Sequence, residues 1–407
     1  MSESIAVQRQ VAAPPDQVYR HLTNATLLRE WLADAATLRP EEGGRLYLGW
    51  DHGYGMVGNF TEMVPGKKVG FTWVGSMDPG PSQVEVTLEP SGSGTTVTVG
   101  HGFPGGDGWE QFERGMTRMW DSSLENLASV IESGEDLRFT RRPMLGVMVD
   151  GELDAARAAD LGVPVDRGVI LGGTVEGMGA EAAGLTGGDV VVRLGGTPIN
   201  GFSSFGVALQ PHRAGDSVDV VYYREGEERS TAMTLSGRPI PEIPADAAAL
   251  SAYVRELYDW VDAELAALFD GVNDAAASAK PVPGEWSAKE VLAHLLDGEG
   301  DGHSSIADLV PASERVSDGP FANSHLRTAV TAASYATPGE MLDAYRHLED
   351  QTAALLASLP DEFVARKGSY WRLAYSYTQA RPHYEEHFAQ IRAALEAAGD
   401  RSATPRG

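Results

Sequence analysis

Apolar and polar residues alternate in short runs through the first part of the chain, and glycine and proline separate these runs. The first strand-like run covers residues 5–11 and ends at Pro14 and Pro15, and a helical pattern follows over residues 16–32. Further strand-like runs lie at 45–50, 56–63, 69–74, 83–89 and 95–101, and an amphipathic helix is predicted over 109–132. A strand, a helix, a sheet and a long final helix over residues 1–140 predict an α+β helix-grip fold.

Three motifs carry a family resemblance of this first segment. They are Ala13-Pro-Pro-Asp-Gln-Val-Tyr19, Leu28-Arg-Glu-Trp31-Leu32, and the glycine, tryptophan and leucine spacing from Gly115 to Gly134. On these motifs the segment resembles the SRPBCC (START-like) superfamily, in the branch homologous to activators of the heat-shock chaperone ATPase. The resemblance implies a hydrophobic cavity between sheet and long helix, and therefore a small hydrophobic ligand.

The histidines and tryptophans of this segment have two interpretations. His52 and His101 are candidates to line the cavity, but structural hydrogen bonds within strands or loops are the favoured interpretation. Core packing is likewise favoured over a ligand cage for the four tryptophans, because aromatic side chains dominate the energetics of protein cores. These are Trp50, Trp73, Trp109 and Trp120.

Residues 141–243 predict a small β-rich domain. Ala183-Gly-Leu-Thr-Gly-Gly-Asp-Val-Val191, followed by Gly196-Thr-Pro-Ile199, is similar to PDZ domains of the HtrA type. The resemblance implies that an extended peptide adds to the sheet edge, with backbone N–H groups holding its terminal carboxylate. The positions that match the peptide site are Leu145, Gly146 and Val147 in the carboxylate loop, and Phe205 and Leu209 on a helix at about 203–211.

Two other interpretations of this domain stay open or are set aside. A PDZ domain that serves as an internal spacer without a peptide ligand is an equal alternative. HtrA proteases place this module after a serine protease, but no Gly-x-Ser-x-Gly motif and no plausible triad precedes it here. We therefore do not infer proteolysis.

From residue 244 to residue 400 the apolar positions recur at helical spacing. Helices are predicted over 246–270, from Ser287 onward, over 338–359, and from Pro382 to the end of the segment. Ser287 and Glu290 form a capping box, and proline suits the first turn of a helix. Four such helices predict an all-α four-helix bundle. Residues 401–407 are predicted to be a disordered tail.

The last predicted helix carries the strongest candidate for chemistry. His383 and His387 are four residues apart, so both lie on one helix face, at the edge of the apolar stripe that includes Tyr384 and Phe388. Both imidazoles are therefore expected to point into the bundle and to reach one metal ion. His294 lies on the buried stripe of the second helix and supplies a third ligand.

This segment also resembles a known family. Trp286-Ser-x-x-Glu290-Val-Leu-x-His294-Leu and His383-x3-His387-Phe-x-Gln-Ile are similar to the motifs of the DinB-like superfamily. The resemblance implies a divalent metal, commonly zinc or nickel, held by the three histidines. Some members are metal-dependent transferases or isomerases that use low-molecular-weight thiols such as mycothiol or bacillithiol. Others have no known activity, so a metal that only stabilises the bundle, or no metal, is the alternative.

Two competing motifs overlap this site. His383-Tyr-Glu-Glu-His387 matches the inverzincin pattern, but those peptidases take a further ligand from far downstream, so we set this aside and keep Glu386 as a hydrogen-bond partner of the ligands or a base. The run from Asp297 to Asp308 is similar to a calcium loop, but its positions eight and twelve do not fit, and a glycine-loosened, solvated helix end is favoured. His303 is expected to be structural or to lie at the edge of the metal pocket.

Composition limits the partners. The 407 residues carry a formal charge of −26 with no basic region, so nucleic acid and anionic membranes are not expected partners. There is no cysteine, so any thiol chemistry must come from a cofactor or substrate. Neither a signal-like N-terminus nor a run of 18 apolar residues is present, so a cytoplasmic protein is expected. The DinB resemblance further implies a homodimer. The opposing overall hypothesis is a non-catalytic adaptor that senses a ligand in the first domain and docks peptides through the PDZ domain.

Overall fold

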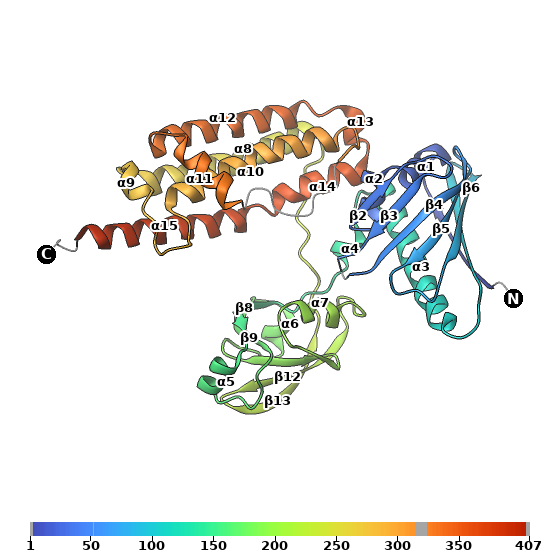
Figure 1. The fold of residues 1–407 in the computed structure, drawn as a ribbon, viewed down its shortest axis with the longest axis horizontal. Helices are drawn as coiled ribbons and strands as arrows, with labels where there is room; N and C mark the ends of the chain where they lie inside the picture. The colour runs from blue at the N-terminus through green and yellow to red at the C-terminus, as the bar shows by residue number, and fades with distance from the viewer. Residues whose placement is uncertain (1–2, 52, 315–323, 404–407) are drawn as a thin grey trace. The chain divides into compact units, whose positions relative to one another are not determined.

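The computed structural model describes residues 3–51, 53–314 and 324–403 (Figure 1). Contacts divide the chain into two units. One contains residues 1–135 and 241–407, and the other contains residues 136–240. The first unit joins a sheet domain to a helical bundle, and the second is a small β domain inserted between them in the sequence. No helix among the described residues combines the length and apolar character needed to cross a membrane.

The sheet domain is built on seven antiparallel strands in the order β1-β7-β6-β5-β4-β3-β2. Their alternating burial places one set of apolar side chains on the inner face, as the sequence pattern predicts. The strands are β1 (Glu3–Val11), β2 (Ala35–Leu38), β3 (Arg45–Gly49), β4 (Gly55–Val64), β5 (Lys68–Gly75), β6 (Ser82–Ser91) and β7 (Gly94–Phe103).

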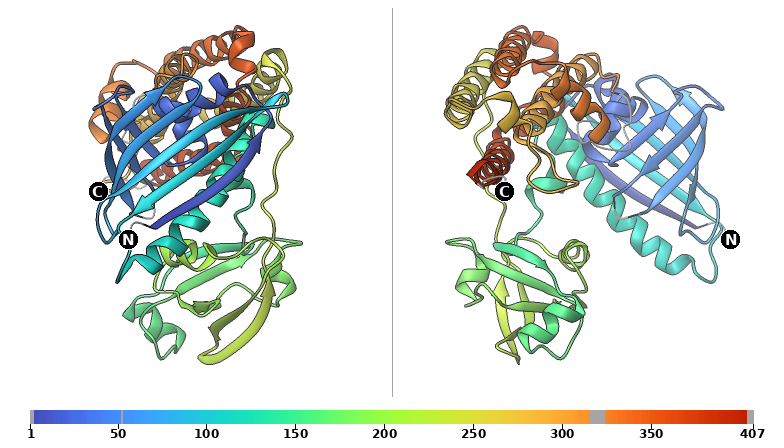
Figure 2. Two further views of the ribbon diagram at one scale, coloured as in Figure 1. Left: turned by 90° about the vertical axis from the view of Figure 1, so that its right-hand side faces the viewer. Right: turned by 60° about the vertical axis from the view of Figure 1, so that its left-hand side comes forward.

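Helices complete the helix-grip. The long helix α3 (Trp109–Glu132) lies along one face of this sheet (Figure 2) and contacts β1 and β7. The predicted single helix over 16–32 is wrong: the structure has α1 (Pro15–Thr23) and α2 (Ala25–Trp31). Asn24 is extended between them, and its side chain accepts a hydrogen bond from the Leu27 N–H, which starts a new helix. The short strand β2 was not predicted from the sequence.

Aromatic side chains pack between this sheet and α3. Trp73 and Trp120 are buried with their ring centroids 5.8 Å apart, and both contact the buried imidazole of His101. The Trp120 indole donates to His101 Nδ1 at 3.1 Å, and Nε2 lies 2.8 Å from the Ser82 hydroxyl. The structural interpretation of His101 is therefore confirmed, and burial lowers its pKa to about 4. Trp109 is buried too, and Trp50 packs against the same core. His52 lies outside the described residues.

The second unit has the strand order β13-β12-β10-β9-β8, with β11 paired to β10. β8 stands at one end of this order, so it is an edge strand. The strands are β8 (Val147–Glu152), β9 (Val169–Thr174), β10 (Val190–Leu194), β11 (Thr197–Pro198), β12 (Ser217–Arg224) and β13 (Glu227–Thr234). The helices are α4 (Leu137–Thr140), α5 (Ala155–Leu161), α6 (Gly179–Ala182) and α7 (Ser203–Leu209), of which only α7 was predicted.

Four long helices form the bundle. They are α8 (Ala247–Phe269), α10 (Ala288–Leu309), α12 (Pro338–Ala357) and α15 (Arg381–Ala403). α8 and α10 each pack against both α12 and α15, so the four helices enclose one core. Shorter helices not predicted from the sequence join them: α9 (Asp274–Ala277), α11 (His325–Ala333), α13 (Asp361–Val364) and α14 (Lys367–Thr378).

Helices α10 and α15 both extend further than the sequence predicts. The glycine-loosened end near residue 298 is wrong, because α10 continues through Gly298, Gly300 and Gly302 to Leu309. A continuous helix also excludes the loop that a calcium site requires there. At the C-terminus, α15 reaches Ala403 and so includes the first residues of the tail predicted for 401–407; residues 404–407 lie outside the described residues.

Within the first unit, α14 connects the bundle to the sheet domain by packing against α2 and α3. The Ser369 hydroxyl donates to Glu30 Oε1 at 2.6 Å, and Glu30 is buried. Burial raises the pKa of Glu30 to about 7, against the opposing effect of Arg372. Arg29 forms an ion pair with Glu314 at 2.6 Å. The connection between sheet domain and bundle is therefore polar as well as apolar.

Candidate metal centre

The candidate site lies between α10 and α15. α10 begins with the predicted capping box: the Ser287 side chain accepts from the Glu290 N–H, and Glu290 in turn accepts from the Ser287 N–H at 2.8 Å. This cap fixes the first turn of the helix that carries His294 two turns further on. On α15, Tyr384, Phe388 and Ile391 are buried in the bundle core, which orients the neighbouring histidines toward α10.

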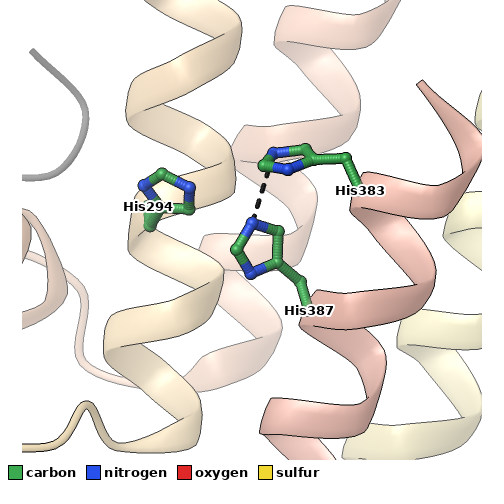
Figure 3. A group of neighbouring side chains, drawn as sticks. All are labelled: His294, His383 and His387. Carbon is green, nitrogen blue, oxygen red and sulfur yellow. Dashed lines mark hydrogen bonds between the residues drawn. The ribbon is translucent and has the colours of Figure 1, made fainter. Parts of the chain in front are cut away.

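His294, His383 and His387 point toward one another (Figure 3). One ligating nitrogen from each lies within 4.8 Å of the other two. The ring centroids of His294 and His387 are 4.8 Å apart, and Nε2 of His387 lies 3.2 Å from Nε2 of His383. His294 and His387 are buried, but His383 is exposed, so the expectation that both α15 histidines point away from water is wrong for His383. The cluster therefore opens to solvent on one side.

The electrostatics of the cluster favour neutral imidazoles. Burial lowers the pKa of His387 to about 4, although the hydrogen bond with Gln390 opposes this change. Burial and the neighbouring His294 also lower the pKa of His383. His387 Nδ1 lies 2.9 Å from the Gln390 side-chain oxygen, which can only accept, so Nδ1 carries the proton and Nε2 keeps its lone pair. That lone pair faces the other two rings.

These residues fit a divalent ion of the zinc or nickel type. Three neutral nitrogen donors without a carboxylate are a ligand set that such ions accept, and they leave a coordination position for another group. Nitrogens about 2.1 Å from a tetrahedral ion lie about 3.4 Å apart. The 3.2 Å separation of the two α15 nitrogens is close to this value, and the outer limit of 4.8 Å needs only a small closure of the rings. Gln390 is the outer partner that holds one ligand in orientation.

A pocket of about 740 Å³ opens beside the imidazoles. Trp286 covers one side, with its ring centroid 5.1 Å from that of His294, and its indole donates to His325 Nδ1 at 2.9 Å. Leu295 and Tyr384 add apolar surface to the lining. The pocket is therefore large enough for a small organic molecule next to the three ligating nitrogens.

Two further residues were predicted near the site. Glu386 lines the pocket and is exposed. His303 is not part of the lining: its Nε2 contacts the Thr352 hydroxyl at 2.7 Å and the Leu348 carbonyl at 3.2 Å. Its position is thus structural, and Thr352 stands between it and a residue of the pocket.

Sequence reasoning missed that pocket residue, Glu299. Its Oε1 accepts hydrogen bonds from the Tyr258 hydroxyl at 2.7 Å and from Thr352. The residue lies in the glycine-rich run that was interpreted as a solvated helix end. The missed signal is its spacing: Glu299 follows Leu295 by four residues, so on a continuous helix both side chains share the face that lines the pocket.

A second carboxylate, Glu349, is buried in the core of the same bundle with 1% of its surface exposed. Within the described ranges, neither oxygen has a hydrogen-bond partner of normal geometry. Burial, followed by the charges of Asp262 and Glu299, raises its pKa to about 9, although Tyr345 and Arg346 act in the opposite direction. Glu349 is therefore protonated at neutral pH.

The residues predicted for peptide binding lie in the second unit. Leu145 and Phe205 are buried in one hydrophobic cluster, and Leu209 packs against it. Gly146 has φ of +76°, and a Cβ there would lie 2.2 Å from the Cβ of Met178. Glycine is therefore required at this turn. Val147 begins the edge strand β8.

The fold and the site together define a multidomain protein whose helical bundle carries a cluster of three histidines, and family models match each of its parts. Residues 12–132 match "Activator of Hsp90 ATPase homolog 1-like protein", residues 143–235 match "PDZ domain", and residues 257–391 match "DinB superfamily". The three resemblances stated from the sequence are confirmed, and so is the multidomain fold class.

Similar proteins cover only parts of the chain. A serine protease Do-like HtrA of Lactococcus lactis is 28% identical over 161 residues, which is 39% of this chain and 35% of that protein. A probable periplasmic serine protease of Haemophilus influenzae is 28% identical over 106 residues, covering 26% of this chain and 22% of the relative. The chain thus spans about a third or less of the length of these relatives.

Among solved structures, protein MLL2253 from Mesorhizobium loti is 25% identical with a TM-score of 0.30, covering 32% of this chain and 97% of that one. The Aha1 dimer from Colwellia psychrerythraea is 21% identical with a TM-score of 0.28, covering 32% of this chain and 96% of that one.

Replacement of the buried carboxyl tests the electrostatics of the bundle core. Below pH 4.5 Glu349 is protonated whether the protein is folded or unfolded; between 4.5 and about 9 only the folded protein keeps the proton, so this residue lowers stability as the pH rises. We expect Glu349→Gln to raise the free energy of unfolding by about 3 kcal/mol at pH 7, and by less than about 0.5 kcal/mol at pH 4. Urea unfolding of the full chain at both pH values measures the difference.

Glu396→Gln, at an exposed position on α15, is the control and should change stability little at either pH. A Glu349→Gln variant that is equally or less stable than the wild type at pH 7 would show that Glu349 is ionised and paired in the folded protein.

Proposed function

We propose that His294, His383 and His387 hold a zinc or nickel ion and that the bundle is a transferase that uses a low-molecular-weight thiol. The observation that carries the proposal is the convergence of three imidazoles beside a pocket of about 740 Å³. The acceptor would be a small hydrophobic electrophile. The match to the DinB superfamily supports a metal at this position.

The ion would supply Lewis acidity that lowers the pKa of a thiol. The residues of the chain have the other tasks. Gln390 keeps His387 in the tautomer that ligates, and Trp286 and Tyr384 exclude water from one side of the pocket. Because the chain has no cysteine, the sulfur nucleophile must come from a second molecule. In an addition the sulfur bonds to the electrophilic carbon, and the proton of the thiol ends on the neighbouring carbon. In a substitution at a chloromethyl group the sulfur bonds to the carbon as chloride leaves, and chloride and the thiol proton are released to water. Neither reaction needs a further reactant.

A second candidate function is peptide docking by the PDZ domain. The edge strand β8 next to the Gly146 turn supports it, because an extended peptide adds to such an edge. Exposed apolar side chains, namely Met148, Val149, Phe202 and Val207, lie on β8, on α7 and immediately before α7. In this adaptor hypothesis the sheet domain binds a small hydrophobic ligand and the bundle has a structural role.

The proposal includes a location and an assembly state. We propose the cytoplasm, where low-molecular-weight thiols are kept reduced, and a homodimer, on the resemblance to DinB-like bundles. Proteolysis is not proposed, and neither nucleic acid nor membrane is a proposed partner.

The metal is tested by elemental analysis of the purified full chain. We expect about one zinc or nickel ion per chain, and less than a tenth of that in a His383→Ala, His387→Ala double variant, because a single remaining imidazole cannot hold the ion. His347→Ala is the matched control, since His347 is exposed and its Nε2 lies 2.9 Å from the Gln351 side-chain nitrogen, away from the cluster. Retention of the ion by the double variant would place the metal elsewhere.

The reaction is tested with monochlorobimane as electrophile and mycothiol, bacillithiol or cysteine as thiol. We expect one of the first two thiols to be conjugated at least tenfold faster with the metal-loaded protein than without protein. Chelation should abolish the acceleration, and zinc or nickel should restore it. Stoichiometric metal without acceleration by any of these thiols would assign the ion a structural role.

Peptide docking is tested by fluorescence anisotropy with peptides that end in apolar residues. We expect the full chain to bind peptides with a free carboxylate and to bind C-terminal amides at least tenfold more weakly. Gly146→Ala should weaken binding because its Cβ meets Met178, whereas Gly162→Ala, also at positive φ but with open space around its Cβ, should not. If peptides with a free carboxylate and C-terminal amides bind equally, or if neither binds, peptide docking is contradicted and the domain is a spacer.

A further inference from the structure

The pocket beside the imidazoles has a second polar end at Glu299. Glu299 follows His294 by five residues on α10, which places it about 7.5 Å further along the helix axis. His294 and Glu299 both line the pocket, from positions about 1.4 turns apart on the helix. A ligand that fills the pocket can reach both at once.

The hydrogen bonds of Glu299 are one-sided. Tyr258 and Thr352 both donate to Oε1, and Thr352 in turn contacts His303. Within the described part of the chain, Oε2 receives no hydrogen bond, although the residue lines the pocket. The side chain is thus held in place through one oxygen while the other is available to a ligand.

Among the residues that the structure describes, no lysine or arginine compensates this carboxylate from within the pocket. The described residues that line it include Glu299 and Glu386 but no lysine or arginine. Arg327 is engaged by Asp297 and Asp301, and Arg346 by Asp262 and Asp343. A half-buried carboxylate without a cation is costly, and a positively charged ligand group recovers that cost.

We propose that Glu299 binds a protonated amine of the ligand, so that the pocket takes aminothiols whose sulfur lies at the histidine cluster and whose ammonium group lies at Glu299. The inference rests on the proposed function for the sulfur end. It specifies the substrate class: thiols that carry a cation at the far end of a chain long enough to reach from the histidine cluster to Glu299 are preferred over neutral or anionic thiols of the same length.

The test uses cobalt-loaded full chain and measures the change in the cobalt absorption spectrum on thiol binding. The probes are ω-aminothiols of two to six carbons, with the ω-hydroxythiol and the ω-mercapto acid of each length. We expect the best aminothiol to bind at least tenfold more tightly than the matching hydroxythiol, and the mercapto acid to bind most weakly. Preference should peak at the chain length that spans sulfur to Glu299.

Three variants assign the preference to one carboxylate. Glu299→Gln should reduce the amine-to-hydroxyl ratio to within about twofold, while cobalt stoichiometry stays the same. Glu385→Gln removes the same charge from an exposed position that pairs with Arg381, and should leave the ratio unchanged. Loss of the preference in Glu386→Gln, with Glu299→Gln unaffected, would overturn the assignment.

The failures of the two proposals are distinguishable. If no thiol changes the cobalt spectrum, the proposed thiol chemistry is wrong. If thiols bind to the wild type but aminothiols and hydroxythiols bind equally at every chain length, only the role of Glu299 is wrong. This comparison uses the wild type alone, so it holds even if Glu299→Gln does not fold. A loss of turnover in Glu299→Gln with unchanged aminothiol binding would also overturn the role as a ligand anchor.

Discussion

The packing of α10 against α15 is the constraint on which the rest of the site depends. A single helix can offer two imidazoles at four-residue spacing, but a third ligand requires a second helix at a fixed rotation. That rotation is set by apolar contacts: Val291 and Leu295 on α10, and Phe388 and Ile391 on α15, share one buried cluster. The hydrophobic core thus determines where His294 meets the other two rings, and binding of an ion would add stability to a geometry that already exists.

Two carboxyl groups of the bundle, Glu349 and Glu299, lower its stability, which favours a role in ligand binding over a structural role. Among the described residues, Glu349 has no hydrogen-bond partner of normal geometry, and Glu299 is anchored through one oxygen only. A neutral residue at position 349 would make a more stable bundle at neutral pH. The proximity of the two carboxyl groups also divides their roles: the charge of Glu299 contributes to keeping Glu349 protonated, so one carboxyl is neutral and buried while the other remains accessible to the pocket.

The convergence of the three histidines could be predicted from the sequence because its signals are periodic. His383 and His387 have helical spacing, and His294 falls on an apolar stripe behind a capping box, so each is placed by local rules. Glu299 was missed because three glycines around it suggested a helix end. The helix continues there because tertiary contacts, including Arg327 with Asp297 and Asp301, compensate the low helix propensity of glycine. The break at Asn24 was missed for the opposite reason, since one capping side chain interrupts an otherwise continuous apolar pattern.

The open side, the size and the charge of the pocket favour a ligand-binding site over a purely structural metal site. An ion that only stabilises the bundle needs neither an open side at His383 nor a cavity of about 740 Å³. It also does not need an accessible carboxylate such as Glu299 in the lining. All three features are used if a ligand occupies the space between the imidazoles and the carboxylate. The excess of acid over base along the whole chain acts in the same direction, because it favours the approach of cationic molecules and disfavours anionic ones.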